Sequence, residues 1–230
     1  MKQILQTSPK LFRPLAVMSV LATTLLLSAC GSTSNPRYYT LSGPVAQPFA
    51  SASTAPLFVE LAPVAVPERL ARPQMVLTKP GGQSAELELL EQYRWTSSFE
   101  NEIRDALSAG ITNRLGAVDV SKSGPSQGQA VWRIAVQLRQ FDAIENTRVD
   151  AAFSWTARRS DTGRNAACQW SGSEPVGTGI DALAQGAQRM TDRAAEKIAS
   201  HLAALAADPA SPCPRLSLIH ISEPTRLRRI

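Results

Sequence analysis

The sequence predicts an α+β fold in which two helices pack on one face of a mostly antiparallel sheet. Three successive segments between residues 132 and 170 alternate apolar and polar side chains with a period of two, which is typical of β-strands. Two other segments, at about 99–115 and 181–206, carry apolar residues three and four positions apart, which is typical of amphipathic helices. Since the chain runs in the order strands, helix, strands, helix, we expect the helices to form a layer of their own on the sheet.

The first 29 residues have the pattern of a bacterial lipoprotein signal peptide. Basic residues precede an apolar run from Leu15 to Leu27, which is shorter than the roughly 20 residues that span a bilayer. The tetrapeptide Leu-Ser-Ala-Cys that ends at Cys30 resembles a lipobox, so we expect cleavage between Ala29 and Cys30 and lipidation of the Cys30 thiol. Glycine at position 31, in place of the aspartate that retains similar lipoproteins at the inner membrane, predicts an outer-membrane anchor facing the periplasm. An ordinary signal peptide is the alternative.

Composition and charge define one mature domain. We divide the chain into a signal peptide (1–29), a lipidated N-terminus with a first strand and a flexible loop (30–56), a single periplasmic α+β domain (57–215) that includes strand 37–41, and a tail (216–230). The tail resembles the in-frame translation of a sequencing adapter, so we expect it to be foreign; a natural basic tail is the alternative. Between Cys30 and Arg215, 18 basic and 18 acidic residues give a net charge of zero, which does not favour a nucleic-acid partner.

The first half of the domain is expected to hold short strands and one helix. The β-prone segments, which proline, glycine or polar loops separate, are 37–41, 57–61, 74–78 and 85–90. A Gly-Gly pair at positions 81 and 82 predicts that the last two form a hairpin. Ser97 and Glu100 have the spacing of a capping box, which predicts the start of a helix. Apolar residues then recur every four positions until Gly116, which is well placed to end the helix.

The second half is expected to form a three-stranded meander and a long helix. A brief strand at 118–120 precedes the meander. The alternating apolar residues of its three strands are Trp132, Ile134, Val136 and Leu138, then Val149, Ala151, Phe153, Trp155 and Ala157, then Ala166, Cys168 and Trp170. Short polar loops separate these strands and favour antiparallel pairing. The helical spacing of 181–206 stops at Asp208-Pro209.

Two cysteines remain once Cys30 is lipidated. Cys168 and Cys213 are an even pair in an oxidising compartment, which favours a disulfide between them. On the chain-entropy view, the bond closes a loop of about 45 residues and stabilises the fold by roughly 3 to 4 kcal/mol. A free buried thiol at Cys168, which lies on an apolar strand face, is the alternative.

Neither a catalytic set nor a cofactor or metal site is predicted. With the tail excluded, the only histidine is His201, which we expect to be packed or at the surface. The chain has no Gly-x-Ser-x-Gly elbow, no His-Glu-x-x-His motif and no phosphate-binding glycine loop. The acidic residues Glu86, Glu88 and Glu91 are expected to be solvated. We therefore predict that the protein is not an enzyme.

The four tryptophans divide into two groups. Strand alternation predicts that Trp132, Trp155 and Trp170 belong to the core. Trp95 precedes the first helix, and its position allows exposure. A lipid-lining surface is the alternative to the core for any of the four.

Four spaced motifs run through the mature chain between Cys30 and about Ala207. They are Arg37-Tyr-Tyr-Thr-Leu41, the run from Val64 to Val76, Tyr93-Arg-Trp95, and Arg139-Gln-Phe-Asp142. In this combination the chain resembles the PqiC (YmbA) family of ABC-type transport auxiliary lipoproteins. The insert at 42–56 and the Ala-rich final helix carry no motif of that family, so they do not indicate which surface meets a partner.

The resemblance implies a function and a set of partners. It implies a non-enzymatic outer-membrane lipoprotein that docks a periplasm-spanning MCE-domain protein (PqiB-like), and through it an inner-membrane partner, in a lipid transport system. It also implies a homo-oligomeric ring. The alternative function is that of a structural outer-membrane lipoprotein that binds peptidoglycan or another envelope complex.

Overall fold

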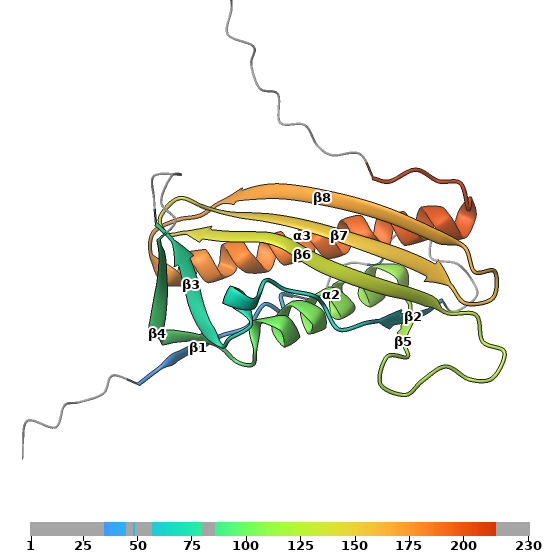
Figure 1. Ribbon diagram of the computed structural model, residues 1–230, viewed down its shortest axis with the longest axis horizontal. Coiled ribbons are helices and arrows are strands. Elements are labelled where there is room, and N and C mark those ends of the chain that lie inside the picture. Colours follow the sequence, from blue (N-terminus) through green and yellow to red (C-terminus); the bar gives the residue numbers. More distant parts are fainter. Residues whose placement is uncertain (1–34, 45–47, 49–56, 80–85, 215–230) are drawn as a thin grey trace, which may run out of the picture. The chain divides into compact units, whose positions relative to one another are not determined.

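The α+β class is confirmed, and the strands divide between two sheets where we expected one (Figure 1). The computed structural model describes residues 35–44, 48, 57–79 and 86–214. The leader, Cys30, most of the insert, the expected Gly-Gly turn and the tail lie outside these residues. No helix within the described ranges is long and apolar enough to cross a membrane.

The larger sheet has five strands in the order β5-β2-β6-β7-β8. Its strands are β2 (Phe58–Leu61), β5 (Val118–Asp119), β6 (Trp132–Ile144), β7 (Arg148–Arg159) and β8 (Asn165–Pro175). The predicted antiparallel meander is confirmed, since β7 pairs antiparallel with both β6 and β8. In contrast, β2 pairs parallel with β5 and β6. The apolar residues of the meander face inward, as their alternation predicts.

Two helices cover the inner face of this sheet (Figure 1). They are α2 (Phe99–Leu115) and α3 (Gly179–Ala207). The predicted capping box is wrong by one residue: Ser98, not Ser97, caps α2 by accepting a hydrogen bond from the backbone N–H of Asn101 at 3.4 Å. The hydroxyl of Ser97 instead donates to a buried carboxylate, as described below. Gly116 ends the helix in the left-handed conformation, as predicted.

The smaller sheet has three strands in the order β1-β4-β3. They are β1 (Arg37–Tyr39), β3 (Gln74–Thr78) and β4 (Leu87–Trp95), and a 3₁₀ turn (Glu68–Leu70) precedes β3. The predicted hairpin pairing of β3 with β4 is confirmed, and β1 joins β4 in parallel. The return strand is longer than predicted and continues to Trp95. Because this brings Trp95 onto the inner side of the sheet against Phe99, its side chain is only 5% exposed, so the exposure that its position in the sequence allows is not found.

The two helices meet at small residues. Gly110 of α2 lies so close to α3 that a Cβ atom added to it would stand 2.6 Å from the Cβ of Ala195. One turn later, the buried Arg114 donates two hydrogen bonds of 2.8 Å to the carboxylate of Asp192 on α3. The close approach and this bidentate pair together set the separation of the two helices.

We expect the substitution Gly110→Ala to destabilise the protein by about 1 to 3 kcal/mol, because the new methyl group forces the packed helices apart. In a helix without such close packing, replacing glycine by alanine stabilises the protein by about 1 kcal/mol. A loss of stability therefore indicates that the helices are packed closely at this position. Urea denaturation followed by circular dichroism measures it. The control Ala109→Ser adds one atom on the exposed side of the same turn and should change stability by less than about 0.5 kcal/mol. A Gly110→Ala protein as stable as the parent contradicts this packing.

Candidate functional site

The segment that follows the predicted lipid anchor is held against both helices by three polar side chains. We call this arrangement the tether clamp: it consists of residues 37–42 together with Glu102 of α2 and Asp181 and Gln188 of α3. The side chain of Gln188 donates hydrogen bonds to the carbonyl oxygens of Thr40 and Ser42, at 2.8 and 3.2 Å. Every residue from Arg37 to Ser42 except Tyr38 therefore forms a hydrogen bond with one of these three side chains.

Glu102 is the centre of the tether clamp. Its carboxylate is buried and accepts hydrogen bonds from two directions. The Thr40 hydroxyl and the Leu41 backbone N–H donate to Oε2, each at 2.9 Å. From the connection between β4 and α2, the hydroxyls of Thr96 and Ser97 donate to Oε1. Burial raises the pKa of Glu102, but these four donors outweigh it and hold the pKa below the ordinary value of 4.5.

Asp181 forms the exposed half of the tether clamp, at the start of α3. Arg37 donates from Nη2 to both carboxylate oxygens at 3.0 Å, and the Tyr39 hydroxyl donates to Oδ1 at 2.6 Å. Partial burial and the bond to Asp181 raise the pKa of Tyr39 to about 12. Both partners of the ion pair are more than half exposed, so it orients the strand and contributes little to stability.

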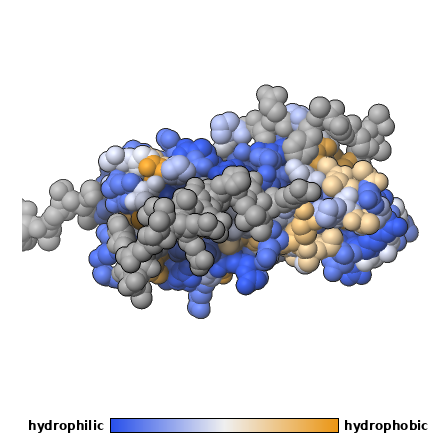
Figure 2. All heavy atoms as spheres, turned by 90° about the horizontal axis from the view of Figure 1, so that it is seen from above, coloured by the Kyte–Doolittle hydropathy of each residue, from blue (hydrophilic) through white to orange (hydrophobic). Residues whose placement is uncertain are grey.

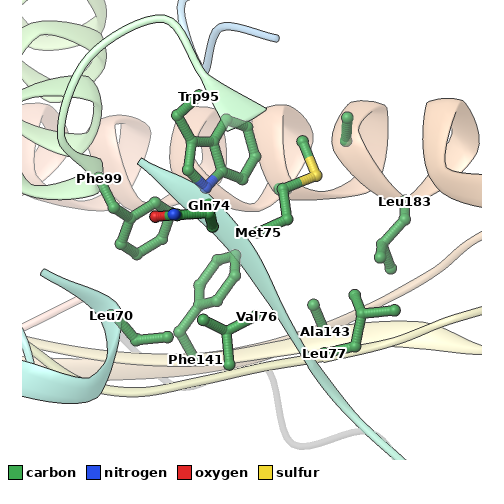
Figure 3. A pocket seen from close by; sticks show the side chains of 12 residues that line it. Leu70, Gln74, Met75, Val76, Leu77, Trp95, Phe99, Phe141, Ala143 and Leu183 are labelled. Atoms are coloured by element: carbon green, nitrogen blue, oxygen red, sulfur yellow. The ribbon is translucent and has the colours of Figure 1, made fainter. Parts of the chain in front are cut away.

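An apolar crevice lies between the β3–β4 hairpin and the helices (Figure 3). Its lining residues come from the small sheet and the 3₁₀ turn before it, from β6 of the large sheet and from both helices. They are apolar apart from one glutamine. The residues are Leu70, Gln74, Met75, Val76, Leu77, Trp95, Phe99, Phe141, Ala143, Leu183, Ala184 and Ala187. The cavity measures about 20 Å³, which is room for one water molecule, so in this conformation it holds no acyl chain.

The outer face of the small sheet exposes apolar side chains. Leu87 and Leu89 of β4 are 41% and 38% exposed, and Leu89 is the cross-strand partner of the half-buried Val76. On β1, Tyr38 is 60% exposed. Leu87, Leu89 and Val76 are therefore neighbours on the outer face of the β3–β4 hairpin.

The outer face of the large sheet carries small uncharged side chains at its centre. In three successive cross-strand rows these are Ala135, Thr156 and Ala167, then Gln137, Ser154 and Gln169, then Gln140, Ala152 and Ser171. The exposed Arg139 lies at the bulge of β6 between the second and third rows. The strand β8 forms one edge and pairs, among the described residues, with β7 alone. Seen from the β8 side, the surface is mostly hydrophilic, with a weakly hydrophobic patch toward the end where the C-terminal half of α3 lies (Figure 2).

The two predicted disulfide partners lie together, beside the histidine. The Sγ atoms of Cys168 on β8 and Cys213 are bonded in the structure, with their Cα atoms 5.6 Å apart. His201 of α3 is buried, and its Nε2 atom lies 3.4 Å from Sγ of Cys168. The ligand atoms of these three residues lie within 4.8 Å of one another, as in a metal site. The oxidation state of the two cysteines in the purified protein stays a prediction.

The remaining predicted residues fall outside a shared site. Ala29 and Cys30 lie outside the described residues, so cleavage and lipidation stay predictions. The acidic residues Glu86, Glu88 and Glu91 are exposed, as expected, and all four tryptophans are buried. Glu102 was not predicted from the sequence, although the sequence contains a signal for it. It lies three positions after Phe99 and four before Ala106, on the apolar face of α2, where an acidic residue needs partners.

Sequence comparison connects the described domain with one family of envelope proteins. The profile of the family described as "ABC-type transport auxiliary lipoprotein component" matches residues 39–199, which is more than half of the chain. No curated protein matches the sequence.

Two solved structures are similar to the chain in fold. One, an uncharacterized protein, is 16% identical, with 74% of this chain and 99% of that chain covered and a TM-score of 0.58. The other, protein XCC0632 from Xanthomonas campestris, assigned to the family DUF330, is 14% identical, with 76% and 100% covered and a TM-score of 0.58. At these identities the likeness concerns the fold.

We expect the substitution Glu102→Gln to destabilise the protein by about 2 to 4 kcal/mol. The reason is that the NH₂ group of glutamine is a donor and would face hydroxyl or N–H donors that now bind a carboxylate oxygen. The pKa of Glu102 is lowered in the folded state, so its contribution is complete above the unfolded value near 4.5 and is lost as the pH falls through the folded value. The difference between parent and variant should therefore shrink below about pH 4.5. Urea denaturation at a series of pH values measures this.

The substitution Glu100→Gln is the matched control, since it removes a carboxylate from the first turn of the same helix. We expect it to cost less than about 1 kcal/mol. Equal effects of the two substitutions, or a difference that does not change with pH, contradict the role of Glu102.

Proposed function

Because the chain belongs to the family of ABC-type transport auxiliary lipoprotein components, we propose that it is the outer-membrane subunit of an MCE-type lipid transport system. The family itself establishes a lipoprotein of the cell envelope that serves a transport system, and it is not a known family of enzymes. In the proposal, the protein faces the periplasm, is lipidated on Cys30, and docks the periplasm-spanning MCE-domain protein. It has no catalytic step of its own.

The tether clamp supports the proposal that the domain is held at the membrane through Cys30. Only six residues separate Cys30 from Arg37, so the Cα atoms of these two residues can be at most about 25 Å apart. Acyl chains on Cys30 therefore keep β1 and the start of α3 close to the membrane surface. Since Glu102 and Asp181 fix β1 on the helices, the described segment nearest to Cys30 belongs to the rigid domain.

The large sheet supports the proposed assembly into a homo-oligomer. The paired residues in the three central rows of the outer face of β6, β7 and β8 are uncharged, and Arg139 at the bulge of β6 is the one charged residue among them. We infer that this outer face forms the contact between copies around a ring.

Light scattering on the soluble domain, residues 31–215, tests the proposal at micromolar concentration, alone and with a candidate MCE-domain partner. We expect a closed oligomer that elutes together with the partner. We expect the substitution Ser154→Glu to yield monomers, because it places a charge at the centre of the proposed contact face. The control Thr162→Glu adds the same charge on the exposed turn after β7 and should leave the oligomer intact.

A monomer that does not bind the partner contradicts the proposal. That result favours the structural lipoprotein, and sedimentation with isolated peptidoglycan then tests the alternative directly.

A further inference from the structure

We propose that Cys168, Cys213 and His201 form a thiol–disulfide exchange site, which a dithiol reductant opens by attacking the sulfur of Cys213. The inference is independent of the proposed transport function. It rests on the different positions of the two sulfurs and on a histidine that is aimed at one of them.

The two cysteines differ in accessibility. Cys213 is exposed, on the segment that follows α3, and its Sγ atom lies 3.3 Å from the carbonyl oxygen of Ala167 on β8. Cys168 is only 7% exposed and belongs to the inner face of the same strand. An external thiolate therefore reaches Cys213 without unfolding of the protein, whereas Cys168 is shielded. Access to one sulfur determines which one is attacked.

The histidine presents an N–H group to the shielded sulfur. The indole N–H of Trp155 donates to Nδ1 of His201 at 3.0 Å. Because indole nitrogen is a donor only, Nδ1 accepts and carries no proton. Burial lowers the pKa of His201 and so favours the neutral ring. The single ring proton then lies on Nε2, which is 3.4 Å from Sγ of Cys168.

This protonation pattern distinguishes the cluster from a metal site. A histidine binds a metal ion through an unprotonated ring nitrogen, and its other nitrogen ordinarily donates a hydrogen bond. Here the nitrogen that faces the sulfurs holds the proton, and the other one accepts from Trp155. The arrangement suits a thiolate, which accepts the hydrogen bond from Nε2, better than it suits a cation.

The exchange proceeds in two balanced steps. A thiolate of the reductant attacks Sγ of Cys213, the bond between Cys213 and Cys168 breaks, and its electron pair leaves on Cys168 as a thiolate. The Nε2–H of His201 stabilises this leaving group. The second thiol of the reductant then attacks the mixed disulfide, which frees Cys213 as a thiolate and leaves the reductant oxidised to its own disulfide. Two electrons pass to the protein, and the two thiolates take up protons from solvent.

Reduction also releases the end of the described chain. The turn after α3 is held by its own contacts, such as the bond from the Ser211 hydroxyl to the carbonyl oxygen of Ala204. Beyond that turn, the disulfide is the covalent tie of the chain to β8. Exchange at this site therefore frees residues 212–214 from the edge of the large sheet.

The mature lipoprotein in detergent tests the site without any substitution. We expect no alkylatable thiol before reduction, even in the unfolded protein. After brief exposure to reduced glutathione and an acid quench, peptide mapping should find glutathione on Cys213, formed at a rate proportional to the glutathione concentration. Glutathione on Cys168, a rate independent of concentration, or two free thiols before reduction overturns the proposal.

Two variants test the histidine. We expect His201→Leu to slow reduction by dithiothreitol by about threefold to tenfold, because the leaving thiolate loses its hydrogen bond. His201→Gln keeps an N–H donor at a similar reach and should retain most of the rate. In concentrated guanidinium chloride the parent and both variants should be reduced at the same rate, since residue 201 no longer lies beside Cys168 in the unfolded chain. If folded His201→Leu and His201→Gln are reduced equally fast, His201 has no part in the exchange.

Discussion

The buried carboxylate of Glu102 is the constraint on which the arrangement of the domain depends. A charge in this position costs several kcal/mol unless donors surround it, so the fold must supply them. Two come from Thr40 and Leu41 and two from Thr96 and Ser97, and these pairs belong to parts of the chain more than 50 residues apart. The first strand, the end of the hairpin and α2 therefore reach their places together, because a partly assembled site leaves a buried charge unpaired.

Small residues complete this arrangement by bringing α3 to α2. Gly110 and Ala195 allow the close approach, and the pair of Arg114 with Asp192 fixes the register. As a result Asp181 and Gln188 lie beside β1 and hold the same segment that Glu102 holds. The first strand and the helix pair thus form one mechanical unit.

The sequence predicted the parts of the fold that follow from local periodicity. The meander from Trp132, both helices and the hairpin all follow from apolar spacing and turn residues. The division into two sheets and the parallel pairing of β2 were not predictable in this way, because they depend on contacts between distant segments. The burial of Trp95 was not predictable for the same reason: the strand that buries it is recognisable only once β1 and β3 pair with it. The disulfide between Cys168 and Cys213 stays a prediction from the compartment, whereas the position of His201 beside these cysteines was not predictable.

Residues 37–42 are locked to the helices by Glu102, Asp181 and Gln188. Hydrogen exchange at the backbone amide of Leu41, measured in the mature lipoprotein, tests this claim most directly. Because this amide donates to the buried carboxylate of Glu102, we predict protection as strong as that of the buried amides within α2. Exchange at the rate of an unstructured peptide would contradict this claim, since residues 37–42 would then not be held on the helices.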